Sequence, residues 1–184
     1  MDSTMKKAPA LAVTEWLNSE QSLSLVDLRG RVVLIEAFQM LCPGCVSHGL
    51  PQAMRVHQTF KHDDVQVIGL HTVFEHCEAQ GTNAALKAFL HEYKISFPVA
   101  IDAPSAAGGI PKTMAAYQMQ GTPTLILIDC NGYLRKQKFG MEQDLTLGAE
   151  IMALMRETDV FTDSPAEKKH TKKLGECDKH GCSL

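Results

Sequence analysis

Apolar and polar positions follow one another along the chain in blocks that have the length of strands or the period of helices. Continuous apolar runs rich in β-branched residues predict strands that are buried on both faces. Apolar residues spaced three and four apart predict amphipathic helices. The predicted strands are Val32–Ile35, Val65–Leu70, Phe97–Ile101, Thr124–Ile128 and the more polar Tyr133–Phe139. The predicted helices are Pro43–Phe60 with a kink at Pro51, Asn83–Tyr93, Pro111–Gln118 and one around Leu147–Met155.

In chain order these elements give βαβαβαββα, after a leading segment in which we interpret Leu11–Leu17 as a helix. Strands that alternate with helices form parallel pairs, and the Asn-Gly turn at 131–132 adds an antiparallel hairpin. The pattern therefore predicts an α/β fold with a mixed sheet. We place this domain at residues 22–156, between an N-terminal extension (1–21) and a flexible tail (157–184).

Composition and charge limit the classes of function. A chain of 184 residues with 45% hydrophobic content is one domain that can bury a core. The formal net charge is −3 and the basic residues are dispersed, which argues against a nucleic-acid partner. The first apolar stretch is interrupted by Glu15 and Asn18, which is typical of neither a signal peptide nor a membrane span. We therefore expect a cytoplasmic protein with no membrane partner.

Two of the six cysteines, Cys42 and Cys45, stand two residues apart between a buried strand and a helix that opens with Pro43. A cysteine at a helix start faces unpaired amides and the positive end of the helix dipole, which favour the thiolate. Cys45 lies one turn further on and can reach the same sulfur. The pair predicts a catalytic dithiol, in which Cys42 attacks a disulfide and Cys45 resolves the mixed disulfide.

Two further features accompany this cysteine pair. Glu36 stands inside the apolar run, where a carboxylate is costly unless it is used. We interpret it as the acceptor of the Cys45 proton, with a solvent-facing glutamate as the alternative. Thr122 and Pro123 come directly before a buried strand, and we predict a cis bond between them, although a trans bond without function also fits.

The segments "VVLIEAFQMLCPGC" and "GTPTLILID", together with the Asn-Gly hairpin, resemble the thioredoxin superfamily. The segment "LRGRVVLIEAF" and the extra helix and strand between Thr82 and Asp102 are similar to its TlpA-like and redoxin (AhpC/TSA-related) branch. The resemblance covers about residues 22–155. It implies a thioredoxin-like fold with three layers, α/β/α, around a central mixed sheet that carries the TlpA-type helix–strand insertion.

The same resemblance implies dithiol–disulfide exchange without a cofactor, between a disulfide-containing protein substrate and a thiol electron donor. Glu36 occupies the position of the buried aspartate of thioredoxins. The loop of Thr122 and Pro123 is expected to receive the backbone of the partner, and Pro43 and Gly44 are expected to contact it as well.

Three other functions remain as alternatives. The first is a thiol-dependent peroxidase in which Cys42 is oxidised and Cys45 resolves the sulfenic acid. Its Pro-x-x-x-Thr-x-x-Cys signature is absent, because Ile35 and Gln39 occupy the Pro and Thr positions. The second is a non-catalytic binding module with the same fold. The third is a metal site, but a lone CxxC needs two further ligands, and we predict no metal here.

Polar residues outside this motif form two more groups. One group follows the second predicted strand and forms either a substrate-facing or metal-binding rim or an exposed polar loop: His71, Glu75, His76 and Cys77. The other is the pair Cys177 and Cys182 in the tail. We interpret this pair as a possible second dithiol that exchanges electrons with the first, with a metal-binding tag or a passive tail as alternatives.

Overall fold

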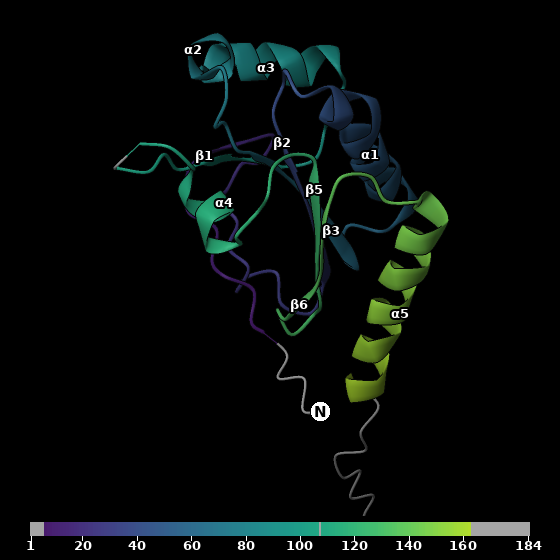
Figure 1. Ribbon diagram of the computed structural model, residues 1–184. Helices are drawn as coiled ribbons and strands as arrows, with labels where there is room; N and C mark the ends of the chain where they lie inside the picture. The colour runs from purple at the N-terminus through teal and green to yellow at the C-terminus, as the bar shows by residue number, and fades with distance from the viewer. Residues whose placement is uncertain (1–5, 107, 163–184) are drawn as a thin grey trace, which may run out of the picture.

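The computed structural model describes residues 6–106 and 108–162 (Figure 1). In chain order its elements are β1 (Val13–Leu17), β2 (Val32–Phe38), the π-helical turn η1 (Cys45–Gly49), α1 (Leu50–Thr59), β3 (Val65–His71), α2 (Cys77–Gln80), α3 (Asn83–Glu92), β4 (Val99–Asp102), α4 (Lys112–Ala116), β5 (Thr124–Ile128), β6 (Leu134–Phe139) and α5 (Asp144–Thr162). Each strand and helix predicted after residue 31 is present, with short additions at α2 and η1.

The strands form one six-stranded mixed sheet in the order β1-β4-β3-β2-β5-β6. The pairs β2–β3 and β3–β4 are parallel, whereas β1–β4, β2–β5 and β5–β6 are antiparallel. This confirms the mixed sheet and the closing hairpin. Strand β2 lies at the centre, where Glu36 is opposite Gly69 of β3 on one side and Leu125 of β5 on the other.

Helices cover both faces of the sheet, and Figure 1 shows α1 and α5 on one side and α4 on the other. Successive side chains of a strand point to opposite faces. Leu34 and Phe38 of β2 therefore join the core beneath α1, α3 and α5, while Val33 and Ile35 join the core beneath α4. Glu36 has the parity of the first pair, so its carboxylate points toward the layer that contains the cysteine helix. The three-layer α/β/α arrangement predicted from the sequence is confirmed.

The helix expected over Leu11–Leu17 is wrong. These residues contain strand β1, which pairs antiparallel with β4 and places Leu17 opposite Val99. A short apolar run does not by itself distinguish a helix from a strand. Here the run is a strand because it pairs with β4, more than eighty residues away in the sequence. Residues that the sequence assigned to an N-terminal extension thus complete the edge of the sheet.

The helix that follows the cysteine motif begins at Pro43 and stays helical through Pro51 to Thr59. Its one irregularity is the π-helical turn η1, in which the Leu50 amide donates to the Cys45 carbonyl, and Pro51 stands in the first turn of α1. At the other end of the chain α5 continues to Thr162, past the predicted domain end at 156. No helix within residues 6–106 and 108–162 combines the length and apolarity needed to cross a membrane.

Candidate active site

Cys42 stands at the junction between the central strand and the helix. It directly precedes the first helical residue, Pro43, and its carbonyl accepts the Val46 amide at 3.1 Å. Its Sγ atom accepts the Cys45 backbone amide at 3.2 Å and donates to the Thr122 carbonyl at 3.4 Å. An amide at a helix start stabilises negative charge on the sulfur that it contacts. Cys42 therefore lies at a helix N-terminus, as the sequence predicts.

Cys45 is fully buried behind Cys42, which is itself half-buried, and both are free thiols. Burial, with a smaller effect of the neighbouring Cys42 thiol, raises the pKa of Cys45 well above its usual range. An accessible outer sulfur and a shielded inner sulfur are the arrangement that sequential attack and resolution require.

The Thr122–Pro123 peptide bond is cis, as predicted. Pro123 is buried against the cysteine helix at two glycines. A Cβ atom at Gly44 would lie 3.2 Å from Pro123 Cδ, and one at Gly49 would lie 3.1 Å from Pro123 Cβ. The helix and the proline loop therefore pack directly together, because neither glycine carries a side chain.

Glu36 is 2% exposed, and its Oε1 atom has no hydrogen-bond partner among the described residues. Burial raises the pKa of this carboxyl to about 8. The oxygen lies against the helix one turn beyond Cys45, at a distance of only 2.1 Å from the position of a Cβ on Gly49. The alternative of a solvent-facing glutamate does not fit this burial.

A groove of about 370 Å³ opens beside Cys42. Its walls combine apolar side chains, Leu41 and Phe139, which are 57% and 52% exposed, with the polar groups of Glu75 and Thr122. Pro43 also lines the groove. The groove thus combines the reactive cysteine with exposed apolar and polar side chains.

Beneath the groove lies a polar network that the sequence did not reveal. The buried side chain of Gln39 accepts two backbone amides of the β3–α2 loop and donates weakly, at 3.4 Å each, to Glu75 Oε2 and Thr122 Oγ1. Gln80 donates to Gln39 Oε1 at 3.1 Å and accepts the Leu41 amide at 3.1 Å. The one hint in the sequence was Gln39 itself, a polar residue between the buried strand and the cysteine motif. The network joins the cysteine loop, the loop after β3 and the proline loop.

The profile of the Redoxin family matches residues 4–150 of the chain. The chain belongs to the Redoxin family. Among curated relatives, protein DipZ of Mycobacterium bovis is 34% identical over 136 residues, which are 72% of this chain and 18% of DipZ. The thiol-disulfide oxidoreductase ResA of Bacillus thuringiensis is 29% identical over 135 residues, or 73% of this chain and 69% of ResA. This redoxin thus spans under a fifth of DipZ.

Two solved structures are similar to this redoxin over most of its length. A crystal structure of a thioredoxin-like superfamily protein is 59% identical with a TM-score of 0.79, and covers 82% of this chain and 96% of its own. A thiol-disulfide isomerase from Corynebacterium glutamicum is 49% identical with a TM-score of 0.76, and covers 80% and 96%. The thioredoxin-like fold and the redoxin resemblance drawn from the sequence are confirmed.

The polar group after β3 does not form a single rim in this redoxin. His71 is the last residue of β3 and is 3% exposed, with its ring 5.2 Å from that of Phe38. Glu75 and His76 line the groove, whereas Cys77 is exposed on α2. His71 is buried because the strand runs one residue beyond the apolar run. The described residues hold no cluster of metal-ligating side chains, and the pair Cys177 and Cys182 lies outside them.

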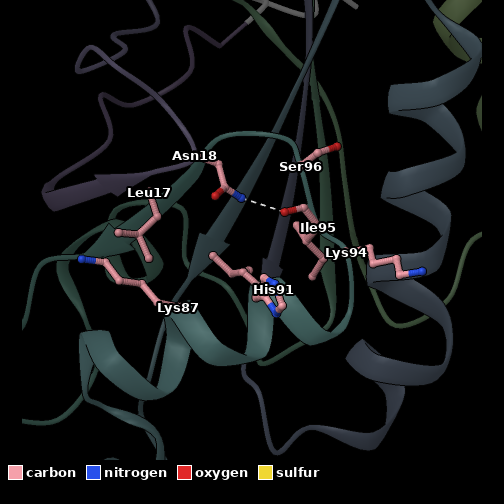
Figure 2. A pocket seen from close by; sticks show the side chains of 8 residues that line it. Leu17, Asn18, Lys87, His91, Lys94, Ile95 and Ser96 are labelled. Carbon is pink, nitrogen blue, oxygen red and sulfur yellow. Dashed lines mark hydrogen bonds between the residues drawn. The ribbon is translucent and has the colours of Figure 1, made fainter.

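A separate hollow of about 570 Å³ lies between the end of β1 and α3 (Figure 2). Asn18 in its wall already donates to the Ile95 carbonyl at 2.7 Å. Lys87 and Lys94 extend away from each other in Figure 2, so they present no shared site for an anion. We assign no chemistry to this hollow.

Proposed function

We propose that this redoxin is a thiol–disulfide oxidoreductase that exchanges the dithiol of its CPGC motif with a disulfide on a partner protein. The observation that supports this most directly is the setting of Cys42 Sγ. The sulfur accepts a helix amide, borders an apolar groove and has the buried thiol of Cys45 behind it. Relatives that carry the names of thiol-disulfide oxidoreductases and isomerases agree with this proposal.

In the first step the Cys42 thiolate attacks one sulfur of the partner's disulfide. A bond forms between Cys42 and that sulfur, the partner's S–S bond breaks, and the second partner sulfur leaves as a thiolate. The amide of Cys45 supports the negative charge on Cys42 before the attack. The partner's segment lies in the groove between Leu41 and Phe139, next to Thr122.

In the second step Cys45 attacks Cys42 and releases the partner in its reduced form. The Cys45 thiol must first lose its proton, which its buried position opposes. We propose that the Glu36 carboxylate accepts this proton. Gly49, against which Glu36 lies, closes the turn η1 that begins at Cys45, so the carboxyl and the thiol face the same short stretch of the cysteine helix.

The role of Glu36 has opposite pH dependences in the two directions of exchange. Because its pKa is about 8, roughly a tenth of Glu36 is ionised at pH 7, and resolution by Cys45 accelerates as pH rises through 8. Reduction of the Cys42–Cys45 disulfide by a thiol donor instead needs neutral Glu36, which protonates Cys45 as it leaves. That direction slows over the same range. In the cytoplasm, a location that stays a prediction, the net direction is reduction of partner disulfides.

Trapping the mixed disulfide tests this proposal. The Cys45→Ser variant should accumulate covalent complexes that a thiol reductant releases, because the resolving sulfur is gone. Cys42→Ser should form none, and Cys77→Ser, which removes an exposed cysteine outside the motif, should behave as the wild type. The pure wild-type protein should also reduce insulin disulfides. Failure to do so, with no trapped complex, would instead support a non-catalytic binding module.

A further inference from the structure

A second cavity, of about 310 Å³, lies behind Glu36. It opens between the cysteine helix and the segment that leads into α5, and it shares no lining residue with the groove beside Cys42. The wall between the two openings is the contact of Gly44 and Gly49 with Pro123. The carboxyl of Glu36 is thus reached from a different side of the molecule than the reactive sulfur.

The interior of this cavity suits water. Its volume corresponds to several water molecules at about 30 Å³ each. Glu36, at 2% exposure and with a free Oε1, lines its inner end, and Gln52 lines its side. A buried polar atom without a protein partner is satisfied most simply by water.

The charged groups around the cavity leave the carboxyl of Glu36 without an ionic partner. Arg55 of α1 pairs with Asp144 at 2.8 Å, and Glu142 pairs with two lysines of β6. His48 of η1 is exposed at the rim, where its Nδ1 lies 2.7 Å from its neighbour Ser47. These ion pairs therefore line the opening of the cavity, and none of them neutralises Glu36.

We propose that this cavity holds water against Glu36 and is the route by which its carboxyl exchanges protons with the solvent while a partner covers the groove. The inference rests on the proposed role of Glu36 in resolution. During that step the partner is bonded to Cys42 and closes the groove, so a proton received by Glu36 needs another exit. The second cavity provides one, with Met141 at its rim.

The step is balanced in protons and electrons. Cys45 gives a proton to Glu36 and its electron pair to Cys42, the bond from Cys42 to the partner breaks, and the partner leaves as a thiolate. Water in the cavity then takes the proton from Glu36 and returns the carboxylate to its starting state. No further oxidant or reductant takes part.

Hydrogen–deuterium exchange at the Glu36 carboxyl tests the route. Reduced protein at pH 6, where Glu36 is neutral, is mixed rapidly with D₂O, and the carboxyl band is followed by infrared spectroscopy. The band is assigned to Glu36 because it is absent from the spectrum of the Glu36→Gln variant. Capping Cys42 with N-ethylmaleimide closes the groove, and Cys42→Ser treated in the same way controls for alkylation elsewhere. Met141→Trp obstructs the rim of the cavity, and Leu145→Trp is the matched control, because Leu145 is 86% exposed and outside the lining.

Exchange should be equally fast in the wild type, the capped protein and Leu145→Trp, and at least about tenfold slower in Met141→Trp. Slow exchange after capping, or fast exchange in Met141→Trp, would overturn the route. The measurement reads the proton on Glu36 itself and does not depend on Cys45. The proposed role of Glu36 in resolution has its own test: it would be contradicted if Glu36→Gln left the rate of partner release unchanged.

Discussion

Replacement of Glu36 by glutamine should change how the stability of the reduced protein depends on pH. The pKa of Glu36 is about 8 in the folded protein, against an ordinary value of 4.5, because the carboxyl is buried. Between these values the unfolded chain has released this proton and the folded chain still holds it. The stabilising contribution is therefore complete below pH 4.5 and is lost as pH rises toward 8. Glutamine has nearly the same shape and no proton to lose.

The linkage relation gives the size of the effect. Between pH 5 and 8 the wild type should lose about 3.5 kcal/mol of unfolding free energy relative to Glu36→Gln, at up to about 1.4 kcal/mol per pH unit. Urea unfolding of both proteins at pH 5, 6, 7 and 8, with a reductant present, measures this difference directly. Glu20→Gln, at an exposed position, is the control for the loss of one carboxylate as such.

The contributions of all other titrating groups to the pH dependence cancel in this difference, because both proteins share those groups. If the difference between wild type and Glu36→Gln stayed constant within about 0.5 kcal/mol from pH 5 to 8, the carboxyl would have the same pKa in the folded and unfolded chains. Glu36 would then not be desolvated, and both its proposed role as proton acceptor and its place in the second cavity would lose their basis.

Further predictions concern the cysteines, a buried histidine and a glycine. Alkylation of the reduced protein near pH 7 should label Cys42 before the inner cysteine, which is fully buried; the reverse order contradicts the assignment of nucleophile and resolving thiol. Stopped-flow oxidation of Cys42 by hydrogen peroxide should be close to that of a generic thiolate, and a rate many orders of magnitude higher would favour the peroxidase. Burial lowers the pKa of His71 to about 4, so acidification from pH 7 to 5 should cost the wild type about 2 kcal/mol more than His71→Leu, as measured by urea unfolding. Equal losses would mean that His71 is solvated. Gly49→Ala places a methyl group where Glu36 Oε1 lies and should slow resolution of the mixed disulfide by Cys45, whereas Gly148→Ala, with open space around it, should not.

The central part of the fold could be predicted because its signals are local. The runs at 32–35, 65–70 and 124–128 are apolar on both faces, which in a chain of this length occurs mainly in the middle of a covered sheet. The same run made Glu36 conspicuous, since a carboxylate is costly inside it, although the sequence alone left a solvent-facing glutamate open. The cysteine pair followed from its position between that strand and a helix that opens with proline.

Features that depend on distant partners could not be predicted in this way. The segment Leu11–Leu17 contains a strand because the edge of β4 is open to pairing. Nothing within the segment itself indicates that such an edge exists. The network around Gln39 depends on α2, a helix of four residues that periodicity cannot detect. The cavity behind Glu36 arises from the approach of the α5 segment to α1, which no single stretch of sequence encodes.

The contact of Gly44 with Pro123 restricts which sequences this scaffold can adopt between its two cysteines. Pro43 is exposed, so many side chains fit there without disturbing their surroundings. Any Cβ at position 44 would press on the proline ring at 3.2 Å, and at that separation the neighbouring atoms must shift. A combinatorial library of the two central residues should therefore yield functional clones that are more diverse at position 43 than at position 44. Redox properties of this scaffold should therefore be easier to tune by substitution at position 43 than at position 44.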